Sequence, residues 1–348
     1  LFRSICARIY ADVFYILTDY QEDSDIIQLV NDITKKISGL EYGPMLRPCF
    51  GISRGEECEN SITLLCELAA FAHKYGKGKS LTTWTFYNAA IREDIIEEKQ
   101  LESEMEFALR SGQFKVFLQP QYVIGTREVV GAEALVRWEH PEKGMVYPSK
   151  FIPLFEKNEF ILKLDEYVWE RVCMLLKRWE RLGMKQIPIA VNMSRLHLRS
   201  PDLKEKLNYI LEKYQIPKSG LELELTENLL FEDLDNAIRI LAGLRDEGFT
   251  LNMDDFGSGY SSLNMLRNIP IDVLKIDRNF FDEKILTPRG KIIVKYVVSM
   301  AKELNMRIVA EGVETAAQES FLKEIGCDVA QGYYFSRPIS IEEFEKKF

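Results

Sequence analysis

From Phe114 onward the sequence alternates between short apolar runs and longer segments with helical spacing, and this order constrains the fold more than any other feature. Segments such as residues 164–182, 235–247 and 289–304 have the helical spacing. The strand-like runs are residues 115–122, 129–137, 188–192, 221–225, 250–254, 273–276, 307–310 and 329–333. Eight strands that alternate with helices predict a closed TIM-like (β/α)8 barrel.

The first two strands of this barrel are joined by Gly125, Thr126 and Arg127 alone, which is a hairpin signal. We therefore expect strands one and two to be antiparallel, which makes the barrel irregular. An open doubly wound sheet is the alternative. No GxGxxG motif follows any of the strands, however, so nothing indicates a dinucleotide-binding crevice.

A smaller α/β domain is predicted before the barrel. Residues 1–88 contain strand-like runs at 7–18, 45–52 and 80–87, with helical spacing at 25–37 and 63–75. Residues 89–112 are charged and helical without glycine or proline until Gly112, and we interpret them as a connector that packs on a neighbouring domain or on a second copy. The barrel then occupies residues 113–348.

Composition excludes several classes of protein. The formal net charge of −9 argues against a surface that binds duplex nucleic acid, which usually needs a basic patch. The six cysteines are scattered without a CxxC pair, so we expect reduced, mostly buried thiols and a cytoplasmic location. No signal peptide and no apolar run of about 18 residues occurs, while a sensor domain upstream stays open. The three histidines form no ligand group, so any metal site must use oxygen ligands.

The stretch TLNMDDFGSGYSSL, residues 250–263, carries two adjacent acids where a strand meets a glycine-rich loop. Adjacent side chains on a strand point to opposite faces. Asp254 and Asp255 can therefore serve one site only if Asp255 lies where the strand turns into the loop. A solvated Asp-Asp turn is the alternative.

Polar residues occupy the same end of the other strands too, where catalytic groups of α/β barrels lie. They are Glu133, Arg137, Asn192, Glu222, Glu224, Glu227, Lys275, Glu311, Glu314 and Gln331. Taken singly, Glu133 could face outward, Lys275 could be solvated, and Glu314 could be a helix N-terminal acid. Together, converging carboxylates would repel one another unless cations lie among them, so the group predicts bound metal.

An all-oxygen ligand set suits Mg²⁺ or Mn²⁺. We expect two ions in the site. The first would be held by Glu133, Asn192, Glu224 and Asp254. The second would share Asp254 and be held by Asp255 and, directly or through water, by Glu311. Two metals beside a lysine suit in-line attack of water on a phosphodiester.

Seven segments in order resemble the motif set of the EAL-domain phosphodiesterases, which open cyclic di-GMP to the linear dinucleotide pGpG. They are EALVRW, VNMS, LELTEN, DDFGSGYSSL, LKID, AEGVE and QGYYFSRP, within residues 101–348. The resemblance implies catalytic roles for Glu133, Asp254, Asp255, Lys275 and Glu311. Glu311 would be the general base and Lys275 would position the water.

The same resemblance implies further roles. Arg137, Gln331 and Gln119 would contact the substrate, Glu227 would anchor the mobile loop after Asp255, and Glu314 would be a supporting acid. It also implies a homodimer formed through the barrel, with the loop of residues 256–262 coupling dimer geometry to metal binding.

The first domain resembles a degenerate, N-terminally truncated GGDEF domain. The five signature positions read Tyr10, Ala11, Asp12, Val13 and Phe14, where the nucleotide turn needs glycines. Val13 also removes an acid that the cyclase chemistry needs, and the inhibitory RxxD pattern is absent. We expect a regulatory or dimer-forming remnant without cyclase activity.

A non-catalytic cyclic di-GMP receptor that signals to a protein partner is the alternative function. Members of that kind usually lack metal ligands, whereas this chain keeps all of them. The metal-dependent phosphodiesterase is therefore the favoured interpretation.

Overall fold

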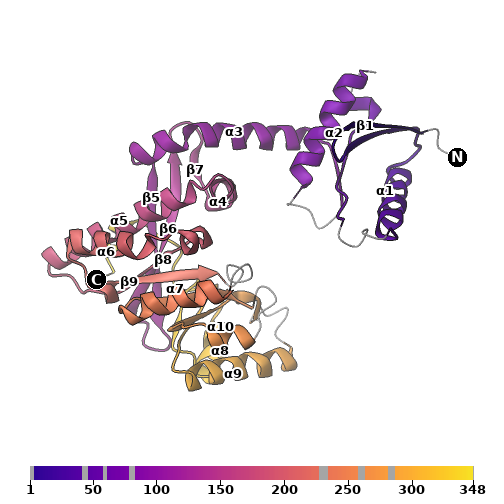
Figure 1. The fold of residues 1–348 in the computed structure, drawn as a ribbon. Coiled ribbons are helices and arrows are strands. Elements are labelled where there is room, and N and C mark those ends of the chain that lie inside the picture. The colour runs from indigo at the N-terminus through magenta and orange to yellow at the C-terminus, as the bar shows by residue number, and fades with distance from the viewer. Residues whose placement is uncertain are drawn as a thin grey trace. The chain divides into compact units, whose positions relative to one another are not determined.

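The computed structural model describes residues 4–40, 46–57, 61–77, 83–226, 234–257, 263–280 and 287–347. The chain divides into two compact units, Leu1–Ser103 and Glu104–Phe348. The boundary falls within the long helix α3 (Ala89–Arg110), so the predicted connector is one continuous helix (Figure 1). The assignment of residues 89–112 as a separate segment stays a prediction.

The second unit is a closed barrel of eight strands (Figure 1). Its strands are β5 (Phe114–Val123), β6 (Val129–His140), β8 (Ile189–Asn192), β9 (Leu221–Thr226), β10 (Thr250–Phe256), β11 (Val273–Ile276), β12 (Arg307–Ala310) and β13 (Val329–Ala330). They pair in the order β5-β13-β12-β11-β10-β9-β8-β6, and β6 closes the ring on β5. The predicted antiparallel first pair is confirmed, because β5 and β6 run antiparallel.

The barrel is mixed rather than purely parallel. Strand β5 is antiparallel to both neighbours, β6 and β13, while the other neighbouring strands pair in parallel. The expectation of a TIM-like barrel therefore holds at the level of a closed eight-stranded α/β barrel. A short strand that the sequence did not predict, β7 (Gly144–Val146), folds back on β6 as a hairpin.

Helices lie outside the barrel, and all but the last of them, which follows β13, lie between strands in the sequence (Figure 1). They are α4 (Pro148–Lys157), α5 (Ile161–Arg181), α6 (Leu203–Tyr214), α7 (Leu234–Asp246), α8 (Leu263–Asn268), α9 (Pro288–Glu303), α10 (Ala316–Glu324) and α11 (Ile341–Glu345). Local signals explain their starts. The Thr287 hydroxyl accepts a hydrogen bond from the Gly290 amide with Pro288 at the first helical position, and Thr315 forms a capping box with Gln318.

The alternation of residues along each strand separates an apolar outer face from a polar inner one. In β9, Leu221, Leu223 and Leu225 belong to the main hydrophobic core beneath the helices. Glu222 and Glu224 alternate with them and therefore point into the barrel. Inside, a small separate apolar cluster of Val273, Val309, Val329 and Val130 accompanies the polar groups. The barrel interior is thus unusually rich in buried charge.

The first unit differs from its prediction in detail. The apolar run 7–18 forms two antiparallel strands, β1 (Ser4–Tyr10) and β2 (Val13–Thr18), because Ala11 turns the chain at a φ of 42°. Strands β3 (Phe50–Ile52) and β4 (Trp84–Phe86) pair in parallel and are shorter than predicted. Helices α1 (Asp23–Ser38) and α2 (Ile62–Gly76) cover the predicted helical segments.

Three further expectations concern the molecule as a whole. The thiols are not mostly buried: of the five cysteines described, Cys173 and Cys327 are buried, whereas Cys6 is exposed and Cys49 and Cys66 are half-buried.

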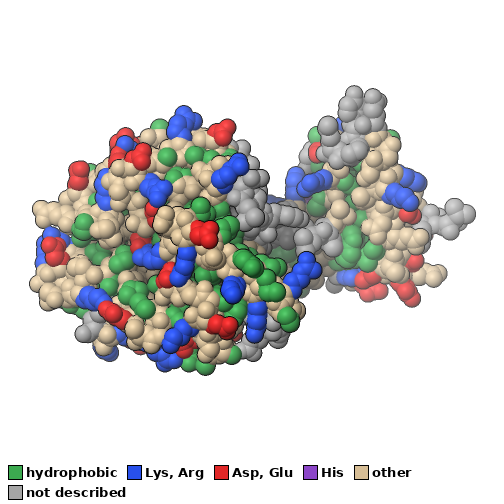
Figure 2. All heavy atoms as spheres, turned by 90° about the horizontal axis from the view of Figure 1, so that it is seen from below, with side chains coloured by type: hydrophobic (Ala, Val, Ile, Leu, Met, Phe, Trp, Pro, Cys, Tyr) green, Lys and Arg blue, Asp and Glu red, His purple; other side chains and the backbone are tan. Residues whose placement is uncertain are grey.

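Across the described residues, no helix combines the length and apolarity that a membrane span requires. On the face shown in Figure 2, the coloured acidic and basic side chains of the barrel are intermixed rather than gathered into one broad basic patch.

Candidate active site

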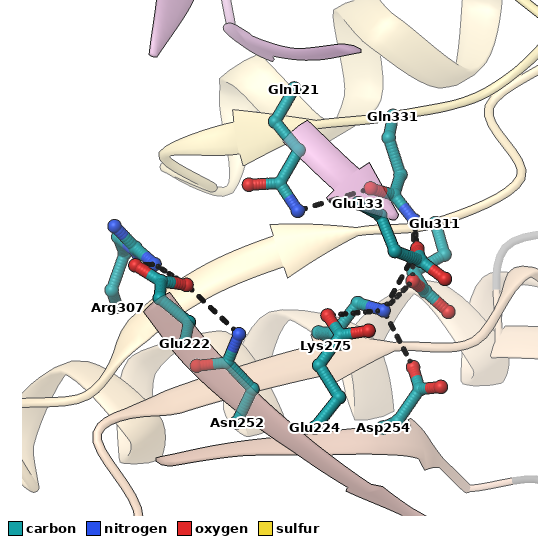
Figure 3. A network of polar contacts seen from close by, with 10 residues as sticks. All are labelled: Gln121, Glu133, Glu222, Glu224, Asn252, Asp254, Lys275, Arg307, Glu311 and Gln331. Atoms are coloured by element: carbon teal, nitrogen blue, oxygen red, sulfur yellow. Dashed lines mark hydrogen bonds and ion pairs between the residues drawn. The ribbon is translucent and has the colours of Figure 1, made fainter. Parts of the chain in front are cut away.

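The buried ammonium of Lys275 lies at the centre of the candidate site (Figure 3). Its Nζ atom is 2.7 Å from Glu311 Oε1, 2.8 Å from Glu224 Oε1, 2.9 Å from Asp254 Oδ1 and 3.1 Å from Glu133 Oε2. These side chains come from five different strands or strand ends, as the sequence predicted. The side chain of Lys275 is 0% exposed, which excludes the alternative of a solvated lysine.

This geometry corrects one premise drawn from the sequence. The converging carboxylates are not unpaired, because Lys275 contacts four of them. With all groups ionised, however, one ammonium faces five carboxylates when Asp255 is included. Repulsion among them still favours protonation or the binding of further cations.

The pKa values of the cluster reflect this imbalance. Burial, opposed by Lys275 but reinforced by the neighbouring carboxylates, raises the pKa of both Glu224 and Glu311 well above the ordinary value. Burial alone would lower the pKa of Lys275, but the surrounding acids together raise it well above its ordinary value. Lys275 therefore stays charged, while the charged forms of Glu224 and Glu311 are disfavoured.

The cluster fits a divalent cation. Oε2 of Glu224 is buried and accepts no hydrogen bond from any described residue. Asp254, Asp255 and Glu311 each present an oxygen within 4.8 Å of the other two. A buried carboxylate oxygen without a donor and a group of converging hard oxygens are what Mg²⁺ or Mn²⁺ binds. The residues predicted for the second ion are thus brought together.

A break in the strand brings Asp255 to the same side as Asp254. The pairing of β10 with β11 shifts register between Met253 and Phe256, and Asp255 has a φ of 53°. Such a bulge redirects a side chain, and aspartate tolerates the left-handed conformation better than most residues. The condition set by the sequence, that Asp255 lie where the strand turns, is met. Gly257 follows at a φ of 96°, where a Cβ would collide with the Phe280 ring.

Asp255 should make metal binding depend on pH. Burial, then the charges of Asp254 and Asp277, raise the pKa of Asp255 to about 6. A ligand must be deprotonated to bind, so we expect deprotonation of Asp255 to raise Mn²⁺ affinity about tenfold between pH 5 and pH 7. Asp255→Asn keeps the backbone preference but removes the titrating group. Calorimetric titrations should find weaker binding with a shallower pH dependence in this variant, and an unchanged slope would contradict the assignment.

Two glutamines hold the acids of the site in place. Gln331 Nε2 donates hydrogen bonds to Glu133 Oε2 at 2.6 Å and to Glu311 Oε1 at 2.7 Å. Gln121 Nε2 in turn donates to Gln331 Oε1 at 3.1 Å, which orients the Gln331 amide (Figure 3). The sequence analysis did not single out Gln121. The pattern that could have indicated Gln121 is its spacing of two residues from Gln119 in the otherwise apolar strand β5, which places both side chains on one face.

Arg137 and Gln119 lie close to the cluster without joining it. Arg137 is half-buried on β6, four residues beyond Glu133, and its Cζ is 5.7 Å from the centre of the Tyr147 ring. Among the described residues, no acid forms an ion pair with Arg137. Gln119 lies opposite Glu133 in the β5–β6 register and donates to the Ser336 carbonyl at 3.4 Å. Their roles in binding the substrate stay predictions.

The remaining predicted residues lie farther out or outside the described part. Asn192 ends β8 opposite Glu224 in register, with an exposed side chain. Glu314 is exposed and forms an ion pair with Arg278 at 3.1 Å, which links the segments that follow β11 and β12, and its role as a supporting acid stays a prediction. Glu227, and most of the loop of residues 256–262, lie outside the described residues.

A second buried polar group lies deeper in the barrel and was not predicted as a group. Arg307 Nη2 is 2.6 Å from both carboxylate oxygens of Glu222, and Asn252 Nδ2 donates to Glu222 Oε2 at 2.9 Å (Figure 3). Glu222 thus has its own cation, unlike Glu224 two residues later. The pairing joins residues 85 positions apart, which strand periodicity alone cannot reveal.

Comparisons with known proteins agree on one family. The EAL domain family matches residues 102–338. The chain is 34% identical over 355 residues to the cyclic di-GMP phosphodiesterase NbdA of Pseudomonas aeruginosa, covering 99% of this chain and 45% of NbdA. It is 33% identical over 349 residues to the bifunctional diguanylate cyclase/cyclic di-GMP phosphodiesterase MucR of the same organism, covering 97% of this chain and 50% of MucR.

Among solved structures, the chain resembles the PaMucR phosphodiesterase in complex with c-di-GMP, with a TM-score of 0.66 and 37% identity. That match covers 70% of this chain and 99% of the solved chain. The present chain spans about half the length of the curated relatives that it matches.

Proposed function

This chain belongs to the EAL-domain family, and on that premise we propose that it is a metal-dependent phosphodiesterase that hydrolyses cyclic di-GMP to linear pGpG. The observation that carries the proposal is the convergence of Glu133, Glu224, Asp254 and Glu311 on Lys275 at one end of the barrel. The similar solved phosphodiesterase in complex with c-di-GMP supports the choice of substrate.

Two divalent cations, Mg²⁺ or Mn²⁺, are the proposed cofactors. Glu133, Asn192, Glu224 and Asp254 would hold the first, and Asp254, Asp255 and Glu311 the second. When bound, such cations lower the pKa of water and neutralise charge that develops on the phosphate. The buried Glu224 oxygen without a donor and the close oxygens of Asp254, Asp255 and Glu311 support this assignment.

The side chains of the chain supply the remaining steps. Water adds to phosphorus while one ester P–O bond breaks. The carboxylate of Glu311 accepts a proton of the water, and the released oxygen takes up a proton to become a hydroxyl of the linear product. Glu311 is placed for this role because its carboxylate lies 2.7 Å from Lys275 and close to the oxygens of Asp254 and Asp255. Gln331 fixes the orientation of Glu311, and Lys275 keeps the acids convergent and orients the water. Arg137 and Gln119 bind the ester on the rim.

The test is incubation of the purified chain with cyclic di-GMP and Mg²⁺ or Mn²⁺, with the linear product followed by chromatography and Glu133→Ala run alongside. Product from the parent and none from the variant supports hydrolysis at this site. Tight binding of the nucleotide without product, with either metal, would overturn the proposal in favour of a receptor that signals to a partner.

Arg137 should contribute to substrate binding and not to metal binding. A guanidinium hydrogen-bonded to a phosphate contributes about 1.5–3 kcal/mol, so Arg137→Met is expected to raise KM about 10- to 100-fold. Lysine cannot reproduce the paired hydrogen bonds and should recover little of this loss. The matched control is Arg127→Met, at the opposite end of β6, where Arg127 pairs with Glu319. Equal effects of the two variants on KM would exclude the role.

For the first unit we propose a degenerate GGDEF-like domain with a regulatory or dimer-forming role. The alignment with MucR, a protein named for both a cyclase and a phosphodiesterase activity, extends over 97% of this chain and supports the idea. Ala11 holds a positive φ in the hairpin turn, where a glycine would fit without strain. Incubation with GTP should yield no cyclic di-GMP. A sensor domain upstream stays a prediction.

We further propose that the barrel forms a homodimer through α9. Ile292, Ile293 and Tyr296 lie on one stripe of this helix and are between 48% and 68% exposed. Such a stripe is costly to leave in water, and a second copy would cover it. Tyr296→Glu is expected to shift the sedimentation coefficient from dimer to monomer. The control Tyr209→Glu replaces an equally exposed tyrosine on α6 and should leave the dimer intact.

A further inference from the structure

A second buried acid, Asp165 on α5, lies outside the carboxylate cluster and takes no part in the proposed chemistry. Its Oδ2 atom is 3.2 Å from Nε2 of His197, in the short 3-10 helix Arg195–Arg199 that follows β8. Asp165 is 6% exposed and His197 is 0% exposed. A buried acid is costly to keep without a partner, and the short Asp165–His197 distance joins α5 to the segment after β8.

Further contacts from α5 end on the backbone that directly follows the Asn192 side chain. The Ser194 amide donates to Asp165 Oδ2 at 2.9 Å, and the Trp169 indole Nε1 donates to the Asn192 carbonyl at 3.1 Å. The Trp169 ring lies against the His197 ring, with centroids 4.6 Å apart. Met193 lies between Asn192 and Ser194 in the chain. Its amide donates to the Glu224 carbonyl at 2.9 Å, which connects this segment to the candidate site.

Asn192 depends on such support more than its carboxylate neighbours do. A neutral amide oxygen attracts a cation only at short range and in the right orientation, whereas a charged carboxylate attracts it over a longer distance. Strand β8 is only four residues long, and the Asn192 side chain at its end is exposed. Interactions with the strand itself therefore do little to hold this side chain.

We propose that Asp165, Trp169 and His197 are positioning residues that hold Asn192 in place as a metal ligand. The inference rests on the proposed function, in which Asn192 binds the first cation. Residues that orient metal ligands typically contribute about 10- to 100-fold to metal affinity. The packing of a hydrophobic core alone would not produce a specific effect on metal binding.

The test measures Mn²⁺ affinity by calorimetry without substrate. Trp169→Phe keeps a ring but removes the hydrogen bond to Asn192, and Asp165→Asn keeps the size but removes the charge. Both are expected to weaken Mn²⁺ binding about tenfold or more, and saturating Mn²⁺ should restore turnover. The control Trp179→Phe makes the same change on the same helix, where the indole donates to Glu345 instead, and should bind Mn²⁺ as the parent does.

A double-mutant cycle decides between positioning and general destabilisation. In an Asn192→Ala background, Trp169→Phe should cause no further loss of Mn²⁺ affinity, because the ligand that it positions is gone. An additional loss of the same size, or parent-like affinity in both single variants, would overturn the inference. Since Mn²⁺ binding needs no turnover, a parent that binds Mn²⁺ but fails to hydrolyse cyclic di-GMP would count against the proposed function alone.

Discussion

Lys275→Met is expected to destabilise the metal-free protein by about 3–5 kcal/mol, the usual cost of removing one partner of a buried ion pair. The reason is that Lys275 contacts four buried acids, which would then repel one another across the barrel. Urea denaturation in the presence of a chelator measures the loss. The cost should shrink from pH 8 toward pH 5, because protonation of acids with raised pKa values, such as Glu224 and Glu311, relieves the repulsion.

Divalent cations should return part of this lost stability, since they supply positive charge in the same place. Turnover should not return, because the proposed role of Lys275 in orienting water is lost. The control is Lys302→Met, which breaks a half-exposed ion pair with Asp328 and should cost at most about 1 kcal/mol. Equal stability of the two variants in chelator would show that Lys275 does not balance the cluster.

Glu222→Gln and Glu224→Gln should have opposite effects although the two acids lie two residues apart on the same inner face of β9. Glu224 has a raised pKa and a buried oxygen without a hydrogen-bond donor, so its neutral analogue should stabilise the metal-free protein by about 1 kcal/mol or more. The same change removes a metal ligand. Without this ligand, the bound metal would stabilise the charge of the transition state less well. A loss of several kcal/mol there corresponds to a fall in kcat of about 10²- to 10³-fold.

Glu222 already has a cation in Arg307, with two 2.6 Å contacts. Glu222→Gln should therefore destabilise the protein by about 1–3 kcal/mol and leave Mn²⁺ affinity unchanged. Denaturation in chelator and Mn²⁺ titration of both variants give the comparison. Weaker Mn²⁺ binding in Glu222→Gln, or a lower stability of metal-free Glu224→Gln than of the parent, would contradict this division of roles.

Much of the barrel is predictable because its signals are local. The alternation LELEL assigns Glu222 and Glu224 to the inner face of β9 before any contact is known, since side chains alternate along a strand. The short connection at Gly125 indicates the antiparallel pair, which the structure confirms. The errors arise where contacts between distant segments decide the backbone. Strand β13 is shorter than predicted because the backbone at Gly332, with a φ of 153°, packs against Val313 where a Cβ would not fit.

The order of residues along the chain thus determined the strands, their inner faces and the collection of acids at one end of the barrel, because each depends on residues close in sequence. Only the tertiary structure decided how those acids are balanced. It places Lys275 among them, brings Asp255 to the same side as Asp254 through a bulge, and pairs Glu222 with Arg307 while Oε2 of Glu224 has no donor. These outcomes depend on distances of a few ångströms between distant segments, and the strength of a buried charge interaction is set by those distances and by burial.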